Sequence, residues 1–331
     1  MIKSQQPCAM QLPDGRGPLS DTALTLLRGG SAVLPQDFGQ QILDDSDFQL
    51  ALWCCYELHY RGFDGVADER EWDPRVLEFR ALLEARFLSA LRDAVEVEPV
   101  ESVGDIPAML VKLVADDDGP PLSLYLQRSA TAEQFREFVQ HRSLYHLKEA
   151  DPHSWAIPRL HGRAKAALIE IQSDEYGGGS LERMHSQLFR QTMRGLGLTD
   201  GYGDYLNRVP GVTLVISNLM SLFGLHRRWR GAIAGHLAVF EMTSSIPNRR
   251  YARGIRRLGG DDSTARFYDE HVEADAVHEQ IAAYDLCGSL AEDEPALAQD
   301  IVFGAAAALY LDASFGGYLL DRWSAAAPTL L

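Results

Sequence analysis

The stretch FYDEHVEADAVHEQ, residues 267–280, holds His271, Asp275 and His278 at offsets of four and then three residues. In an α-helix these offsets place the three side chains on one face, a turn apart. Two imidazoles and a carboxylate on one face suit a first-row transition metal, iron in particular. The alternative interpretation is a solvent-exposed helix face, because acidic residues flank the three.

A second segment, ALIEIQSDEYGGGSLERMHSQLF (167–189), holds Glu175 and His185 on either side of Gly177–Gly179. On an unbroken helix an offset of ten residues would leave the two side chains about 80° apart. Three glycines allow a kink that turns both side chains toward one point. The glycines also fit a simpler interpretation, in which one helix ends there and a new one begins at Ser180. The two interpretations are compatible.

A third segment, SLYHLKEADPHSWAIPRL (143–160), supplies Glu149 near the end of a helix. A glutamate beside an apolar helix face is usually a surface residue. It becomes a candidate ligand as part of a carboxylate-rich centre, because two bridged metals need about six protein ligands from facing helices. The complete candidate set is Glu149, Glu175, His185, His271, Asp275 and His278.

Helical periodicity dominates the rest of the chain and predicts an all-α protein of roughly ten helices. The best strand signal, TLVIS (213–217), stands inside a helical context. The helices are expected near residues 18–28, 46–61, 73–95, 105–115, 131–149, 151–175, 180–198, 208–246, 263–286 and 295–322.

Composition excludes several classes of partner and compartment. The 31 basic and 47 acidic residues give a net charge of −16, which repels nucleic acid and anionic membranes. Four cysteines form no CxxC pair, as expected in a reducing compartment. The first twenty residues lack the apolar core of a signal peptide, and no run of about 18 apolar residues occurs. We therefore expect a soluble, cytoplasmic protein.

The order Glu, then Glu-x9-His, then His-x3-Asp-x2-His resembles the heme-oxygenase-like non-heme diiron oxidases and oxygenases. The strings EIQSDEYGGG (170–179) and FYDEHVEADAVHE (267–279) are similar to the segments by which iron-containing redox enzymes are recognised. This resemblance covers about residues 130–330. It implies a heme-oxygenase-like helical bundle (101–331) with two Fe(II) ions, O2 as co-substrate and no heme. Residues 1–100 are then an N-terminal helical extension packed on that core.

Such a family member would be an O2-activating oxidase or oxygenase of secondary metabolism. Its substrate would be a small amine, amino acid or fatty-acid-like molecule, changed by N-oxygenation, desaturation or C–C cleavage. The chain carries no dinucleotide or flavin signature, so electrons are expected from an external donor or from the substrate. The expectation leaves room for a homodimer. The alternative is a non-catalytic helical binding protein that kept the fold without iron.

Other residues compete for roles in the site. Glu170 shares a helix face with Asp174 and is the alternative ligand if the register is shifted. Glu241 lies in an apolar run, HLAVFEMTSS, and is expected to be buried, either beside the ligands or paired with the first two arginines of RRYARGIRR (249–257). That basic run is expected to pair with the surplus acid on the surface, or else to hold a substrate carboxylate.

Apolar walls around the centre are expected from Leu188, Phe189, Phe240 and Phe267. The remaining histidines have no partner at ligand spacing and are expected to be structural; they are His59, His141, His146, His153, His161, His226 and His236.

Overall fold

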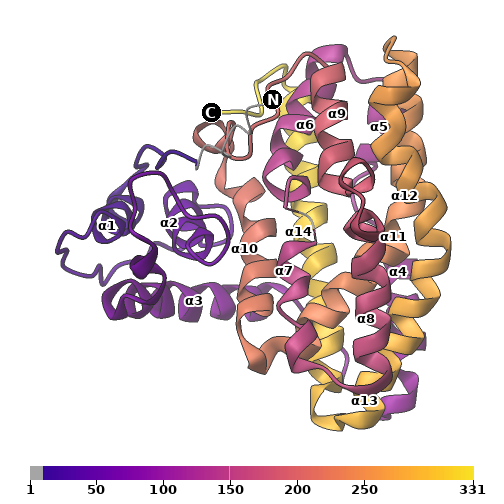
Figure 1. Ribbon diagram of the computed structural model, residues 1–331, viewed down its shortest axis with the longest axis horizontal. Helices are drawn as coiled ribbons and strands as arrows, with labels where there is room; N and C mark the ends of the chain where they lie inside the picture. Colours follow the sequence, from indigo (N-terminus) through magenta and orange to yellow (C-terminus); the bar gives the residue numbers. More distant parts are fainter. Residues whose placement is uncertain (1–9, 149) are drawn as a thin grey trace, which may run out of the picture.

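The computed structural model describes residues 10–148 and 150–331, apart from the side chains of residues 273–277. Regular structure in these residues is helical, and Met10 and Phe63 add one isolated β-bridge. The predicted all-α class is confirmed, and Figure 1 shows a long helical bundle with a smaller lobe at its side.

The helices are connected by loops and 3₁₀ turns. Their bounds are α1 (Pro18–Leu27), α2 (Ser46–Glu57), α3 (Pro74–Ala94), α4 (Ile106–Asp116), α5 (Leu122–Arg128), α6 (Ala132–His146), α7 (Asp151–Ser154), α8 (Gly162–Glu175), α9 (His185–Gly195), α10 (Gly211–Leu225), α11 (Arg230–Arg257), α12 (Asp262–Gln280), the π-helix η8 (Ile281–Gly288), α13 (Ser289–Asp293) and α14 (Ala298–Ser324).

The lobe is built from α1, α2 and α3 and joins the bundle through α2, which packs against α10 (Figure 1). The Asp45 side chain caps α2 by accepting from the amide of Phe48 at 2.7 Å. Asp73 caps α3 ahead of Pro74 by accepting from the amide of Arg75. Helix α2 is buried on nearly every side, because it lies between the other lobe helices and the bundle. The division of the chain near residue 100 stays a prediction.

The bundle is centred on α11, which packs along both α12 and α14 (Figure 1). Two glycines allow the approach of α11 to α14: a Cβ on Gly235 would meet the backbone of Ile301, and one on Gly304 would meet the backbone of Ala232. Helix α14 makes up most of a long apolar helical segment, Pro295–Ser324. By length and composition that segment could span a membrane, but 61% of its most apolar window is buried inside the protein, as in the core helices of soluble proteins.

Several expected helices differ from the structure. The helix expected from Ser180 begins at His185, as α9, after a 3₁₀ turn. The stretch 208–246 is two helices rather than one, since α10 ends at Leu225 and α11 begins at Arg230 after a short turn; TLVIS lies inside α10. Helix α11 then continues through Pro247 to Arg257. The expected helix 151–175 is two helices, α7 and α8, separated by a stretch that contains a 3₁₀ turn at Ile157–Arg159. The helix expected over 263–286 is α12 as far as Gln280 and continues as the π-helix η8.

Candidate metal centre

The triple glycine brings Glu175 and His185 together. Glu175 is the last residue of α8 and His185 the first of α9. All three intervening glycines take the left-handed conformation, with φ of +64°, +59° and +82° for Gly177, Gly178 and Gly179. The chain therefore reverses within a few residues, and Oε2 of Glu175 lies 2.9 Å from Nδ1 of His185. The glycines thus follow the end of α8 and also bring the two side chains together, so both interpretations of the triple glycine hold, with α9 beginning at His185 instead of Ser180.

Helix α12 presents two histidines to the same place. The His271 side chain is buried, and its Nδ1–H donates to the carbonyl of Phe267 at 2.8 Å. Because a carbonyl only accepts, this bond fixes the proton on Nδ1, so Nε2 is the ring nitrogen that could bind a metal ion. The His271 and His185 rings lie 4.3 Å apart, centroid to centroid.

One turn further along α12, His278 lies between two carboxylates. Its Nδ1 is 3.2 Å from Oε2 of Glu241, and its Nε2 is 2.9 Å from Oδ2 of Asp174. Burial acts to lower the pKa of His278, but the hydrogen bond and charge of Glu241, the hydrogen bond of Asp174 and the charge of Glu175 outweigh it and raise the pKa to about 9. A metal ion bound at either nitrogen would take the place of a proton.

These residues form two triads of possible ligands that share Glu175. One triad is Glu175, His185 and His271, and the other is Glu175, Glu241 and His278; within each, the ligand atoms lie within 4.8 Å of one another and every residue is buried. Oε2 of Glu175 lies close to Nδ1 of His185, but the two atoms do not form a hydrogen bond, and no other described residue donates to this oxygen. A buried carboxylate oxygen without a donor is costly, whereas carboxylates and imidazoles together are good ligands for iron. The residues present therefore fit a metal centre.

Four of the six predicted ligands belong to the two triads. Glu175, His185, His271 and His278 converge. Glu149 and the side chain of Asp275 lie outside the described residues. The competing residue Glu170 is exposed and belongs to neither triad.

Glu241 is the candidate ligand that the sequence left undecided. It is buried on α11, where its carboxylate contacts His278. The expected pairing with an arginine is wrong for these two candidates, because Arg249 is exposed and Arg250 donates to Ser123 instead. The signal was an acidic residue inside an apolar helix, but only the packing of α11 on α12 shows which side chain it meets.

Aromatic rings surround the triads on one side. Phe189 and Phe267 are fully buried and lie 5.0 Å apart, and the His146 ring lies 4.6 Å from Phe189 and 4.8 Å from Phe267. His146 thus lies beside the centre, although its spacing gave no sign of this. His153 also lines the adjoining cavity, and its Nε2 lies 3.1 Å from Nδ1 of His236.

Hydrogen bonds behind Glu175 hold the end of α8 in place. The amide of Gln172 donates to the carbonyl of Ala150 and to Oγ of Ser154, both at 2.7 Å. The Tyr176 hydroxyl donates to Oδ1 of Asp151 at 2.8 Å. These bonds tie α8 to α7, so that Glu175, which is between Gln172 and Tyr176 in the chain, keeps its position.

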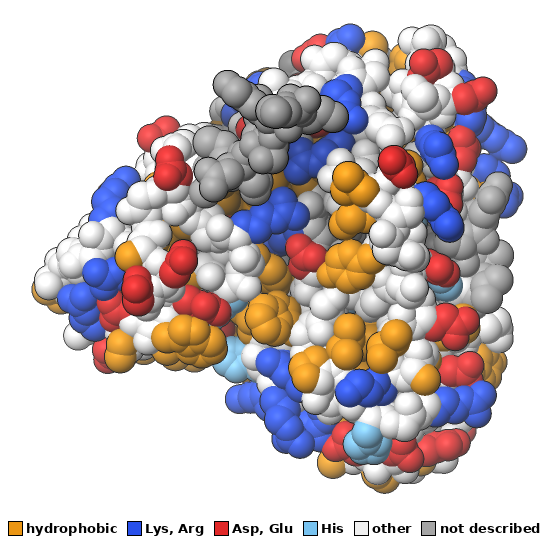
Figure 2. Space-filling view, in the orientation of Figure 1, with side chains coloured by type: hydrophobic (Ala, Val, Ile, Leu, Met, Phe, Trp, Pro, Cys, Tyr) orange, Lys and Arg blue, Asp and Glu red, His pale blue; other side chains and the backbone are white. Residues whose placement is uncertain are grey.

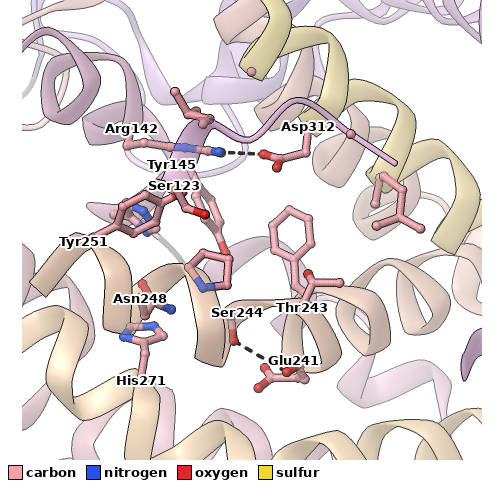
Figure 3. Close-up of a pocket in the computed structure, with 18 of the residues that line it drawn as sticks. Ser123, Arg142, Tyr145, Glu241, Thr243, Ser244, Asn248, Tyr251, His271 and Asp312 are labelled. Atoms are coloured by element: carbon pink, nitrogen blue, oxygen red, sulfur yellow. Dashed lines mark hydrogen bonds and ion pairs between the residues drawn. The ribbon is translucent and has the colours of Figure 1, made fainter. Parts of the chain in front are cut away.

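A cavity of about 410 Å³ opens from the triads toward the surface, a size suited to a small molecule. Figure 3 shows Glu241 and His271 at one end, and the Arg142–Asp312 ion pair with Tyr251 and Ser123 toward the other. The molecular surface in Figure 2 carries mixed acidic and basic side chains, with hydrophobic ones near the middle, over the region of α7 to α9.

The chain is similar to known proteins in sequence and in fold. The profile of the iron-containing redox enzymes matches residues 136–313, just over half of the chain. A curated relative is nitrosourea synthase from Streptomyces achromogenes subsp. streptozoticus, 25% identical over 146 residues, which are 44% of this chain and 31% of that protein. The chain therefore aligns with less than a third of that relative's length.

Among solved structures, a CADD-like protein of unknown function from Nostoc punctiforme superposes with a TM-score of 0.53 and 16% identity. The match covers 66% of this chain and 97% of that one, and it concerns the fold alone. The chain belongs to the family of iron-containing redox enzymes with a heme-oxygenase-like fold. It is accordingly an oxidoreductase by family, and iron is the metal that the family implies.

Proposed function

We propose that this protein is an O2-dependent oxidase or oxygenase with two iron ions, acting on a small molecule in secondary metabolism. The observation that carries the proposal is the pair of triads that share Glu175. A carboxylate common to two ligand groups is suited to bridge two metals. Glu149 and Asp275 are proposed to complete the ligand set, and Glu241 is proposed to join it.

The division of ligands follows the packing. His185 and His271 would hold one iron together with Glu175, while His278 and Glu241 would hold the other. Bound Fe(II) would supply the electrons that reduce O2 beside the substrate. Asp174 is exposed at the end of α8 and would accept a hydrogen bond from the Nε2–H of His278. Carboxylates commonly hold metal-bound histidines in this way.

Other residues of the chain keep water away from the centre. Phe267 is fully buried against His185 and His271, and Phe189 packs against Phe267. Leu188 is fully buried as well, and Phe240 lines the cavity. An apolar wall of this kind limits side reactions with water. The similarity to nitrosourea synthase supports oxidative chemistry of secondary metabolism, with an amine, an amino acid or a fatty-acid-like molecule as the substrate classes to test and a separate reductase as electron donor.

Anaerobic titration with Fe(II) tests the proposal. We expect about two irons per chain, counted by elemental analysis and Mössbauer spectroscopy. His271→Ala and His278→Ala should lose iron and O2 consumption while circular dichroism shows the same helical content. His161→Ala is the matched control, since that side chain is 66% exposed and belongs to neither triad.

Two outcomes would contradict the proposal. Absence of iron above background in the parent protein would favour a helical binding protein without metal. Iron binding that survives both histidine variants would place the metal elsewhere in the molecule.

A further inference from the structure

The end of the cavity away from the triads carries fixed charges of both signs. Arg142, on α6, donates to Oδ1 of Asp312, on α14, at 2.5 Å (Figure 3). The Asp312 side chain is 52% exposed, so the ion pair leaves part of the carboxylate open. Asp117 lines the same cavity, and the pKa of its carboxyl is raised by burial and by the charge of Asp312.

Arg250 adds a cation whose charge is not matched by a carboxylate. It lines the cavity and donates to Oγ of Ser123 at 3.1 Å. Among the described residues no carboxylate lies within ion-pair distance of it. A guanidinium has five N–H donors, and the partner of Arg250 among the described residues is the Ser123 hydroxyl. The Ser123 oxygen accepts from Arg250, so its own O–H is available as a further donor.

Two other arginines of the same run are held by the protein itself. Arg256 pairs with Asp262 and Asp269, and Arg257 donates to the carbonyls of Leu126, Gln127 and Ala130. These two stabilise the fold at its surface, whereas Arg250 faces the cavity. In a chain of net charge −16, a cavity-lining arginine without a carboxylate calls for an anionic ligand.

Tyr251 shows that these charges share one region. Burial raises the pKa of its hydroxyl, the charges of Arg142 and Arg250 act to lower it, and that of Asp312 acts to raise it. Both arginines and the aspartate therefore lie within electrostatic reach of one side chain, which Figure 3 places near Ser123.

We propose that this end of the cavity binds the head group of a free α-amino acid, with the carboxylate on Arg250 and Ser123 and the ammonium on Asp312. The assignment rests on the proposed function, since the amino acid is the substrate whose side chain would extend to the triads. The intervening wall is lined by Phe138, Tyr145, Leu237 and Leu309, with Thr243 and Asn248 as polar groups.

The charges discriminate among the substrate classes. A fatty acid would satisfy Arg250 but would add no second cation beside Asp312, whose carboxylate Arg142 only partly covers, and none beside Asp117. A simple amine would pair with Asp312 and leave Arg250 without an anion. Only a zwitterion provides both partners, and an uncompensated charge in a partly buried cavity weakens binding.

Calorimetry tests the assignment by measuring binding to the 331-residue chain. Each probe is titrated into the metal-free protein and into protein loaded with Fe(II) under anaerobic conditions. The probes are the twenty protein amino acids, and for each one that binds, the corresponding amine without the carboxylate and acid without the amine. We expect at least one amino acid to bind more tightly than both counterparts. R250M should weaken it about ten- to a hundred-fold, the effect of losing a charge-assisted hydrogen bond.

The control is R253M, because Arg253 is an exposed arginine on the same helix and lines no part of the cavity; its affinity should equal that of the parent. R250K, which keeps the charge but not the planar fork, should bind with intermediate affinity. D312N should reduce the preference for the amino acid over its deaminated acid. Circular dichroism establishes that each variant is folded.

The head-group assignment is overturned if no amino acid binds, if the amine or the acid binds as tightly as the amino acid, or if R250M and R253M have equal affinity. Iron content is measured on the same samples. Amino-acid binding without iron would contradict the proposed oxygenase and leave the head-group assignment intact. Iron binding without amino-acid binding would contradict the head-group assignment and leave the proposed oxygenase intact.

Discussion

Glu175 and His185 lie on opposite sides of three consecutive glycines, and Oε2 of the first is 2.9 Å from Nδ1 of the second. The contact joins the C-terminus of α8 to the N-terminus of α9. Glu175 also belongs to the second triad, with Glu241 and His278. One side chain thus links the α8–α9 turn to helices α11 and α12.

Removing this carboxylate should therefore affect iron more than removing a neighbour does. Glu175→Ala takes away the residue common to both triads, so iron content should fall from about two to below one per chain. Glu170→Ala is the matched control on the same helix, because Glu170 is exposed and should keep the parent iron content. Elemental analysis after anaerobic Fe(II) loading measures both. Loss of iron in the Glu170 variant alone would show that the ligand register of α8 is shifted.

The glycine turn should tolerate substitution unevenly. A Cβ on Gly177 would lie 2.5 Å from the backbone carbonyl carbon of Arg183, whereas one on Gly178 meets nothing within 4 Å. Both positions have positive φ, which costs a non-glycine residue about 1–2 kcal/mol. Gly178→Ala should lose about this much unfolding free energy in urea and keep its iron. Gly177→Ala should lose more and bind less iron, because the backbone at Arg183 must move. Equal behaviour of the two variants would mean that the turn does not position the ligands.

Sequence reasoning reached the parts of the centre that depend on local geometry. The helical repeat predicts that His271 and His278 share one face, and the three glycines predict a turn between Glu175 and His185. Glu241 could be recognised as a buried acid, but its partner His278 is 37 residues away and is set by the packing of α11 on α12. No periodicity encodes such a contact between helices.

The same limit applies to the helix breaks. The apolar pattern of 208–246 continues across the boundary between α10 and α11, because α10 and the first ten residues of α11 are almost entirely buried and the turn between the two helices is short. The cavity too is assembled from distant segments, so His146 and Arg250 are recognised as lining residues only once the bundle is formed.

His141 should make the fold sensitive to acid. Burial, with the adjacent charge of Arg142 acting in the same direction, lowers its pKa to about 3; its ring nitrogens lie 2.7 Å and 3.1 Å from the hydroxyls of Thr213 and Thr329. The unfolded chain therefore takes up the proton first, near pH 6.5, and stability falls as the pH drops from there toward 3. The loss is at most about 1.4 kcal/mol per pH unit.

Urea unfolding of the parent and of His141→Gln at several pH values between 4.5 and 7 measures this contribution. Carboxylates titrate in both proteins, so the difference between the two slopes isolates the histidine. We expect a shallower pH dependence in the variant. Parallel curves would show that His141 does not carry the acid sensitivity.

The lobe should depend on one buried ion pair for its attachment to the bundle. Nζ of Lys148 lies 3.1 Å from Oε2 of Glu57, the last residue of α2, and both side chains are almost fully buried. The Tyr202 hydroxyl donates to the same oxygen at 2.7 Å, and Lys148 also lies 4.0 Å from the centre of the Tyr60 ring. Lys148 precedes the predicted ligand Glu149, so this pair connects the lobe to the segment that carries it.

Glu57→Gln would leave the Lys148 ammonium buried without its counter-charge and should cost about 3–5 kcal/mol of unfolding free energy. The double variant Glu57→Gln/Lys148→Met removes the isolated charge and should recover most of that loss. Arg136→Ala, which breaks the surface pair with Glu133, should leave the urea midpoint nearly unchanged. If Glu57→Gln matched this surface control, the lobe would be held by apolar packing of α2 on α10 alone. If the double variant were no more stable than Glu57→Gln, the cost would arise from lost packing rather than from an unpaired charge.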